Sequence, residues 1–142
     1  MITFLALILI LIFLGIAFIH FYWALGGRKW SNLAIPTRST SPEIPLFKPR
    51  VIETLIVTIG FFVFAWIIGM KVQLVPRVWL SQTYTTYAVF GIAFIFLVRA
   101  IGEFRYVGFF KNIKQTPFGQ MDTRYYSPLC LFIAIISLII NL

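Results

Sequence analysis

Apolar residues form four long stretches along the chain, without the alternation of a strand or the single apolar stripe of a surface helix. The hydrocarbon core of a bilayer is about 30 Å thick, and a helix needs about 20 apolar residues to cross it. Windows of that length predict transmembrane helices at approximately Ile2 to Leu25, Val51 to Met70, Tyr84 to Ile101 and Tyr125 to Leu142. The predicted fold class is therefore an all-α polytopic membrane protein, with residues 1–142 as a single four-helix transmembrane domain.

The first stretch differs from a secretory signal peptide. It has no basic N-terminal region, its apolar run is too long, and no small-residue cleavage site follows it. We therefore expect it to be retained as a transmembrane helix.

The two longer connections differ in character. Residues 26–50 contain several prolines and show no helical or strand period, which predicts an extended loop, with Pro49 in the first turn of the second helix. Residues 103–124 alternate aromatic and basic residues. We expect the first half of this segment to continue the third helix as an amphipathic stretch at the interface, and Asp122 and Arg124 to lie just before the fourth helix.

Composition supports a location in lipid. Hydrophobic residues make up 61% of the chain, charged residues only 11%, and mean hydropathy is +0.96. The formal net charge of +8 could indicate nucleic-acid binding, but basic residues also collect in the cytoplasmic loops of membrane proteins. We expect membrane lipids, and no nucleic acid, as partners.

Cysteine and histidine each occur once, as Cys130 and His20. One cysteine excludes an internal disulfide and a Cys-x-x-Cys redox pair, and one histidine excludes bis-histidine haem ligation and a multi-histidine zinc site within one copy. No metal site and no cofactor are therefore expected. Cys130, in apolar surroundings, is interpreted as core filler.

Basic residues indicate the orientation. The connections after the first and third helices are rich in Lys and Arg, whereas the opposite side has only Lys71 and Arg77. The positive-inside rule predicts that both basic connections are cytoplasmic and both termini lie outside.

An internal repeat is visible at an offset of 76 residues, because "GIAFIHFYWALGGRKW" from Gly15 is echoed by "GIAFIFLVRAIGEFRY" from Gly91. Chance similarity between apolar helices is the alternative, and the second and fourth helices match only loosely. The predicted topology gives the first and third helices the same direction, as a parallel repeat of two helical hairpins requires. In this register His20 corresponds to Phe96 and Trp23 to Arg99.

Each helix also brings an ionisable residue to the basic end. Such groups are costly in a bilayer unless they are paired or hydrated, so we expect them to face one another, with Arg99 and Glu103 pairing at i,i+4. Structural ion pairs are the plain interpretation; a cytoplasm-facing pocket, with His20 and a carboxylate handling protons, is the functional one. The candidate cluster comprises His20, Glu53, Arg99, Glu103, Arg105, Asp122 and Arg124 with Tyr22, Trp23, Tyr125 and Tyr126.

Aromatic residues at the same level are typical of an interfacial belt, and an aromatic wall for a ring or prenyl-like ligand is the alternative. Ala65 and Gly69 indicate close packing of the second helix.

The run "YVGFFKNIKQTPFGQMDTRYYSPLCL", together with "HFYWALGG", resembles a family of small bacterial membrane proteins catalogued as domain of unknown function 3995. The resemblance extends over essentially the whole chain and implies a four-helix bacterial membrane protein. It implies no established activity and no catalytic residues.

Three functional hypotheses remain open. The first is binding or transport of an anionic lipid or small amphiphile, with dimerisation expected if the chain forms a pathway. The second is a membrane enzyme that transfers protons on a lipid or isoprenoid, with Glu53, Glu103 or Asp122 as acid or base. The third is an accessory or assembly subunit that works through a membrane partner protein and has a purely structural cluster.

Overall fold

The computed structural model describes residues 1–38, 44–78 and 80–142. These residues form helices joined by loops, with one isolated antiparallel bridge between Thr37 and Pro45. The elements in order are α1 (Ile2–Ala24), α2 (Ser31–Ala34), α3 (Val51–Lys71), α4 (Gln82–Ile101), α5 (Pro117–Met121), the π-helical turn η1 (Asp122–Tyr126) and α6 (Ser127–Asn141).

Four helical segments are long and apolar enough to cross a membrane: α1, α3, α4 and the continuous run from α5 through α6. The predicted all-α class with four transmembrane helices is thereby confirmed. The protein is a multi-pass membrane protein.

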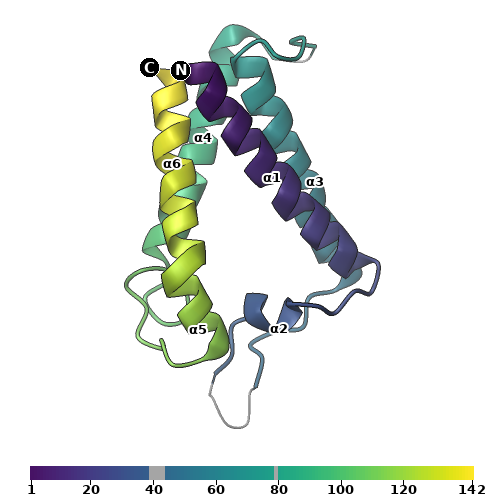
Figure 1. The fold of residues 1–142 in the computed structure, drawn as a ribbon, viewed down its shortest axis with the longest axis vertical. Helices are drawn as coiled ribbons and strands as arrows, with labels where there is room; N and C mark the ends of the chain where they lie inside the picture. The colour runs from purple at the N-terminus through teal and green to yellow at the C-terminus, as the bar shows by residue number, and fades with distance from the viewer. Residues whose placement is uncertain (39–43, 79) are drawn as a thin grey trace.

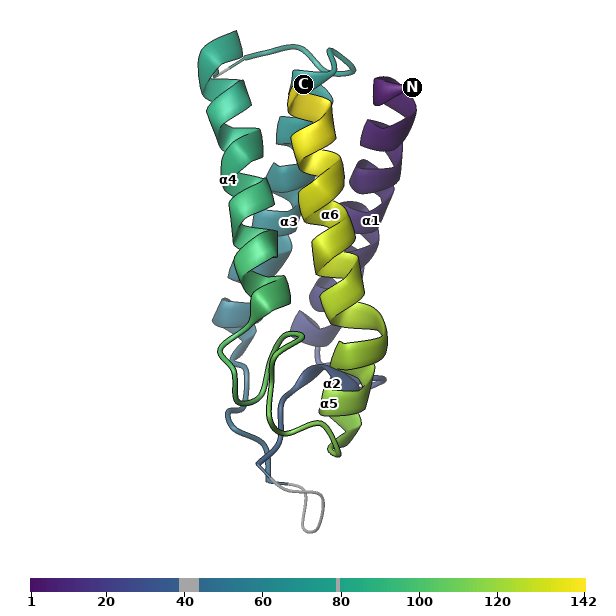
Figure 2. The ribbon, with the colours of Figure 1, turned by 90° about the vertical axis from the view of Figure 1, so that its left-hand side faces the viewer.

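The four long helices form two hairpins, because α1 packs mainly against α3 and α4 mainly against α6. Figure 1 shows that both termini lie at one end of the molecule, where the hairpins are closest. Toward the other end the hairpins diverge, and α2 lies between their tips. The side view in Figure 2 places α6 in front of α3, with α4 and α1 on either side.

Polar contacts tie the hairpins together at both ends. At the terminal end, Lys71 Nζ on α3 donates to Thr86 Oγ1 on α4 over 3.0 Å, and within the second hairpin Asn141 Nδ2 donates to the Thr86 carbonyl over 3.2 Å. At the α2 end, the Tyr126 hydroxyl donates to the Leu33 carbonyl over 3.3 Å. α3 and α6 therefore both contact Thr86 on α4, whereas among the described residues one side-chain hydrogen bond joins α2 to the second hairpin.

The core depends on small residues that let the helices approach, since lipid tails are as apolar as leucine and hydrophobicity alone does not hold helices together in a bilayer. Ala6 and Ala17 are fully buried on α1, and Ala65 and Gly69 are buried on α3, which confirms the predicted close packing. Phe13 fills the space between the hairpins, and its ring centroid lies 5.8 Å from that of Phe64 and 5.7 Å from that of Phe96.

Residues that are 76 positions apart in the sequence often have the same burial in the structure. In α1 and α4 the paired positions Ala17/Ala93 and Ala24/Ala100 are buried, and Gly15/Gly91 and Phe18/Phe94 are exposed. The same holds in α3 and α6, whose sequences match only loosely: Thr58/Ala134 are buried, and Ile59/Ile135 and Phe62/Leu138 are exposed. At these positions the two hairpins agree in burial, as a duplicated hairpin requires, whereas Val57 is exposed and its counterpart Ile133 is buried.

The predicted start of the fourth helix at Tyr125 is wrong, because the helix begins at Pro117. Thr116 is the N-cap, with Oγ1 accepting from the Gly119 amide over 3.0 Å, and proline is well suited to the first helical position. Asp122 and Arg124 therefore lie inside this helix rather than before it. The hydropathy window missed the first turns because residues 115–124 are largely polar.

The predicted continuation of the third helix is also wrong. α4 ends at Ile101, Gly102 adopts a φ of +85°, and the chain folds back so that the Phe109 amide donates to the Ala100 carbonyl over 2.8 Å. Gly108 has a φ of +92°, and a Cβ there would collide with the Ile101 carbonyl. The turn therefore depends on glycine at these two positions.

Two smaller expectations for residues 26–50 need correction. The loop contains the single helical turn α2, and Pro49 precedes the N-cap Arg50 instead of lying in the first turn of α3. Residues 39–43 of this predicted loop lie outside the described residues.

Candidate functional site

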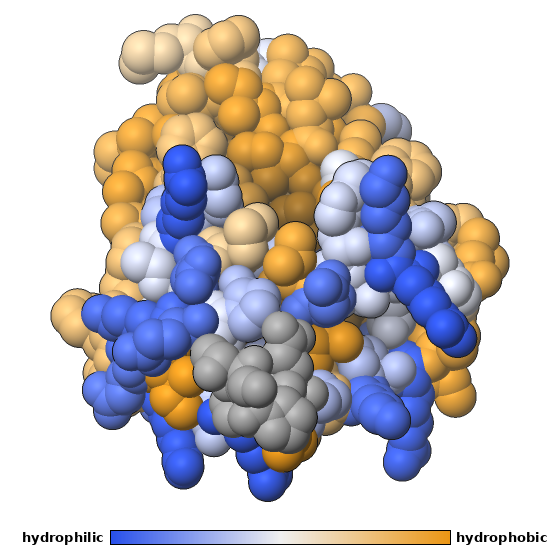
Figure 3. All heavy atoms as spheres, turned by 60° about the horizontal axis from the view of Figure 1, so that its bottom comes forward, coloured by the Kyte–Doolittle hydropathy of each residue, from blue (hydrophilic) through white to orange (hydrophobic). Residues whose placement is uncertain are grey.

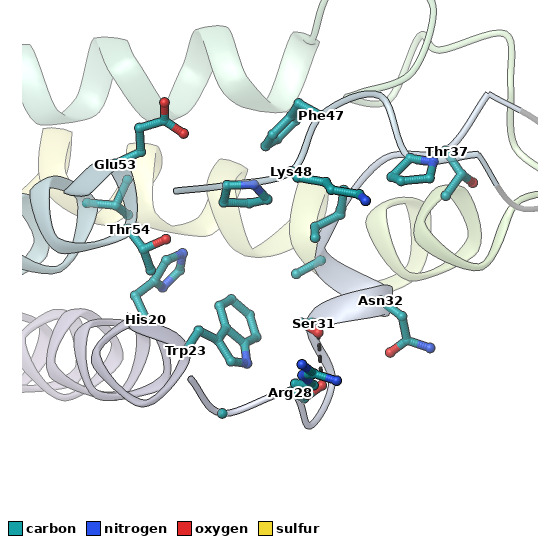
Figure 4. A pocket seen from close by; sticks show the side chains of 16 residues that line it. His20, Trp23, Arg28, Ser31, Asn32, Thr37, Phe47, Lys48, Glu53 and Thr54 are labelled. Atoms are coloured by element: carbon teal, nitrogen blue, oxygen red, sulfur yellow. Dashed lines mark hydrogen bonds between the residues drawn. The ribbon is translucent and has the colours of Figure 1, made fainter. Parts of the chain in front are cut away.

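A cavity of about 910 Å³ lies at the basic end of the first hairpin. Its walls come from the end of α1, from α2, from the segment before α3 and from the first turns of α3 (Figure 4). Apolar side chains on the walls include Trp23, Ile35, Phe47 and Val57, and polar ones include His20, Arg28, Asn32, Lys48, Glu53 and Thr54. The lining is thus amphipathic, with two cations, a carboxylate and a histidine around aromatic and aliphatic surface.

The turn after α1 brings its side chains to this cavity. α1 ends at Ala24, and Gly26 takes a left-handed φ of +93°, which only glycine adopts without strain. Trp23 then donates its indole N–H to the Lys29 carbonyl over 2.8 Å, so the indole is fixed against the returning chain. A Cβ on Gly27 would collide with the ring of Tyr22. The turn that carries Arg28 to the cavity therefore requires glycine at position 26, and Gly27 leaves room for the Tyr22 ring.

His20 is held in a defined orientation on the wall. Its Nδ1 lies 2.9 Å from the Ile16 carbonyl oxygen, which can only accept a hydrogen bond. In the neutral ring Nδ1 therefore carries the hydrogen, and Nε2 is left as an acceptor. The ring also packs against Trp23 at 5.0 Å and Phe61 at 5.8 Å between centroids. The hydrogen bond thus fixes the orientation of the His20 ring in the cavity wall and leaves Nε2 able to accept a hydrogen bond from a ligand.

Glu53 lies on the opposite side of the cavity, in the first turn of α3. Its Oε2 accepts the backbone N–H of Arg50 over 3.0 Å, an interaction that satisfies an otherwise unpaired amide at the start of the helix. Figure 4 shows His20 and Glu53 on separate helices, with their side chains extending from α1 and α3 respectively. The carboxylate thus has a structural role in the helix cap and also lines the cavity.

A second group of ionisable residues lies in the other hairpin, around Asp122. The Asp122 side chain is fully buried; its Oδ1 accepts from Arg99 Nη2 over 2.8 Å, and its Oδ2 accepts from Lys111 Nζ over 2.9 Å. Oδ2 also accepts from the Gly108 amide over 2.8 Å and from Ser127 Oγ over 3.1 Å. This carboxylate therefore joins α4, the loop after it and α6.

The helix distortion at Asp122 has a cause in the sequence. Pro128 has no N–H, and in a regular α-helix its ring would collide with the carbonyl four residues earlier. The chain inserts the π-helical turn η1, in which the Ser127 amide donates to the Asp122 carbonyl five residues back. Single π turns of this kind often occur at functional sites. Here the turn accompanies the buried carboxylate.

The predicted ion pair between Arg99 and Glu103 is wrong. α4 ends before Glu103, so the two residues are not on one helical face, and Arg99 pairs with Asp122 instead. The Glu103 carboxylate accepts from the backbone amides of Tyr106 and Val107. The pairing failed because the i,i+4 spacing holds only inside a continuous helix.

The structure divides the predicted cluster into three parts. His20, Trp23 and Glu53 line the cavity, and Arg99 and Asp122 belong to the buried ion pairs. The remaining residues lie outside both groups: Tyr126 holds α2, Tyr22 packs on Gly27, Glu103 caps the loop, and Arg105, Arg124 and Tyr125 are exposed.

Sequence reasoning missed Lys111, Arg28 and Lys48. Lys111 is fully buried, with Nζ also donating to the Gly108 carbonyl over 2.9 Å, although its basic and aromatic surroundings in the sequence are typical of a solvated loop. The two closely spaced glycines at 102 and 108 were the available signal for a folded-back chain. Arg28 and Lys48 were counted for orientation but not as part of a site.

Comparisons with curated proteins and with solved structures found no match. The family model described as "Protein of unknown function (DUF3995)" matches residues 13–137, which include the second half of α1 and all of the site residues above. The predicted resemblance is thereby confirmed. The chain is a multi-pass membrane protein that belongs to the DUF3995 family.

Proposed function

We propose that the protein binds an anionic amphiphile, such as an anionic lipid, in the cavity of the first hairpin. The observation that carries this proposal is the lining of the cavity, which combines cationic and hydrogen-bonding groups with aromatic and aliphatic walls. Its volume of about 910 Å³ is within the range of known ligand pockets, about 300–1,000 Å³.

Each part of the lining has a defined role in this proposal. Arg28 and Lys48 reach the cavity from different segments, and their exposed side chains supply charge for a phosphate or carboxylate group. His20 Nε2 accepts a hydrogen bond from a ligand hydroxyl, or donates to an anionic oxygen when the ring is protonated. The apolar body of the ligand lies against Trp23, Phe47 and Val57. Transport of the bound ligand across the membrane would extend this function, and it can be assayed once the ligand has been identified.

Native mass spectrometry of protein released from mild detergent tests the proposal. Wild type is compared with Arg28→Ala/Lys48→Ala and with His20→Ala. Arg105→Ala is the matched control, because Arg105 is an exposed cation of the same end that does not line the cavity. We expect a discrete retained mass in wild type and in Arg105→Ala that is lost in the double variant. Retention by all variants, or by none, would contradict the proposal.

A second candidate is proton transfer on the bound amphiphile. It is favoured by the presence of His20 and Glu53 in one cavity, whereas Asp122 already accepts four hydrogen bonds and Glu103 is bonded to backbone amides. Deuterium incorporation into a lipid extract in heavy water, lost in Glu53→Gln, would support it. No incorporation into any lipid by wild type would rule it out.

We further propose that the membrane is the bacterial inner membrane, with both termini outside and the cavity end in the cytoplasm. The support is the charge distribution, because the opposite end has only Lys71 and Arg77. Single cysteines at positions 77 and 105, in a Cys130→Ser background, test this with a membrane-impermeant maleimide. We expect Arg77→Cys to be labelled in intact spheroplasts and Arg105→Cys only after permeabilisation; the reverse pattern would invert the topology.

A further inference from the structure

The cations of the α2 end are not neutralised by the described carboxylates. Of the basic residues at this end, only Arg99 and Lys111 form ion pairs within the described residues, both with buried Asp122. Glu53 and Glu103 accept hydrogen bonds from backbone amides, and Glu43 lies outside the described residues. The other basic residues of this end are all exposed: Arg28, Lys29, Arg38, Lys48, Arg50, Arg105, Lys114 and Arg124. We call these eight side chains the basic ring.

The basic ring surrounds the end of the molecule. Figure 3 shows hydrophilic side chains on several sides of this end, below the hydrophobic surface of the helices. The ring draws on the turn after α1, the segment before α3, the loop after α4 and the turn η1. Its members therefore come from both hairpins, and the charge is not confined to the cavity.

Aromatic side chains accompany the ring at three separate places. Lys29 Nζ lies 4.9 Å from the ring centroid of Trp30, Arg105 Cζ lies 5.2 Å from that of Tyr106, and Arg124 Cζ lies 5.4 Å from that of Tyr125. In each case the two residues are neighbours in sequence. Tryptophan and tyrosine favour the headgroup level of a bilayer, where their rings and polar atoms are both satisfied.

We infer that the basic ring is a binding surface for anionic lipid headgroups of the adjacent leaflet. The aromatic neighbours place the cations at the membrane surface, and the uncompensated positive charge selects anionic over zwitterionic headgroups. The surface acts on the lipids around the protein and does not depend on occupation of the cavity. Nucleic acid and acidic cytoplasmic proteins are the alternative anionic partners. Neither offers the boundary between apolar chains and polar headgroups that the tryptophan and tyrosine side chains favour.

Quenching of Trp30 fluorescence by brominated lipid tests this inference. Trp30 is 55% exposed beside Lys29, and the variant Trp23→Phe/Trp66→Phe/Trp79→Phe retains it as the single tryptophan. The protein is reconstituted in phosphatidylcholine vesicles with 20 mol% phosphatidylglycerol, and one lipid or the other is brominated. We expect phosphatidylglycerol to be enriched at Trp30 by about fivefold, as expected for one basic contact with an anionic surface.

Two charge variants make the test specific. Lys29→Gln/Arg105→Gln/Arg124→Gln removes the three aromatic-paired cations but leaves Arg28 and Lys48 in the cavity, and we expect it to lower the enrichment toward one. Lys71→Gln/Arg77→Gln removes the charge of the other end, and we expect the enrichment to stay unchanged. Salt at 0.5 M should also lower the enrichment of phosphatidylglycerol at Trp30, because screening weakens the attraction between exposed charges.

Quenching of Trp30 by the two lipids in proportion to their mole fractions, in the wild-type charge background, would overturn the inference, as would full enrichment in the triple glutamine variant. If the single-tryptophan protein does not fold, the phosphatidylglycerol content of lipid retained by the unmodified chain and by the two charge variants gives the same comparison. A loss of cavity ligand in native mass spectrometry without a change in enrichment would concern the proposed function only.

Discussion

Asp122 accepts more hydrogen bonds than the other carboxylates in the described part of the chain. Two cationic side chains, a backbone amide and a hydroxyl donate to it. A carboxylate that is buried and fully bonded has no free oxygen for a ligand, and its ion pairs hold three segments in register. We therefore interpret Asp122 as a structural residue of the second hairpin.

Replacement of Asp122 by asparagine should destabilise the protein by about 3–5 kcal/mol, because it leaves Lys111 buried without its counter-charge. Reversible unfolding in mixed detergent measures the effect. Lys111→Met/Asp122→Asn should recover part of the loss, since the uncompensated buried cation is gone. Glu103→Gln is the control, with an expected effect within about 0.5 kcal/mol because its amide oxygen still accepts the backbone N–H groups. Equal effects of Asp122→Asn and Glu103→Gln would contradict this interpretation.

Glycine positions allow a matched pair of substitutions. Gly108→Ala should destabilise by at least about 2 kcal/mol, because its φ of +92° is strained for alanine and the added Cβ meets the Ile101 carbonyl. Gly91→Ala, in the interior of α4 with nothing within 4 Å of its Cβ, should be neutral or stabilising by up to about 1 kcal/mol. Unfolding of both variants under one condition checks the prediction, and a similar effect at the two positions would refute it.

The helical turn α2 is too short to be stable by itself. Four residues are far fewer than an isolated helix needs in water, so α2 exists because neighbouring parts of the protein hold it. Ser31 Oγ donates to the Arg28 carbonyl over 2.9 Å, and Tyr126 donates to the Leu33 carbonyl from the second hairpin. Since α2 also lines the cavity, this tether connects the proposed site to the other half of the molecule.

Loss of the Tyr126 hydroxyl should loosen α2. One hydrogen bond contributes about 1 kcal/mol, so Tyr126→Phe should speed amide hydrogen exchange of residues 31–35 by about fivefold. Exchange in α5 should not change, because the phenylalanine ring still packs against Phe118 of α5, with 6.0 Å between ring centroids. Tyr125→Phe, an exposed neighbour, is the control. Unchanged exchange in α2 would show that other contacts hold it.

The molecule as a whole consists of two hairpins joined by residues 72–81. Most helix contacts lie inside each hairpin, and a hydrogen bond from Lys71 on α3 to Thr86 on α4 joins the two hairpins. This arrangement implies that the covalent link contributes little to the association of the halves, as in the two-stage picture of membrane protein folding.

Fragments 1–77 and 78–142, expressed together, should therefore assemble and co-purify through a tag on one of them. Lys71→Met in the first fragment removes the donor to Thr86 and should weaken assembly about threefold, in line with typical interhelical hydrogen bonds in membranes. Lys29→Met, an exposed cation at the other end of the first fragment, is the control. Failure of the unmodified fragments to associate would show that the hairpins are not separable units.

The sequence alone determined the transmembrane helices and the family, because each depends on local hydropathy or on residue identity along the chain. α1 and α3 were predicted to within one residue at each end, since an apolar run of membrane length has no other stable conformation in a bilayer. The sequence also indicated that His20, Trp23 and Glu53 belong to a polar group at the basic end of the molecule.

Tertiary structure decided which of these groups meet. Lys111 in a loop, Asp122 on a π turn and Arg99 on α4 are brought together by a folded-back chain that hydropathy cannot show. The cavity likewise joins α1 and α3 to α2 and residues 44–49. Pairing between ionisable groups depends on distances across the fold, whereas hydropathy depends on neighbours in sequence. The sequence therefore determined the helices, and only their packing separated the cavity from the buried ion pairs.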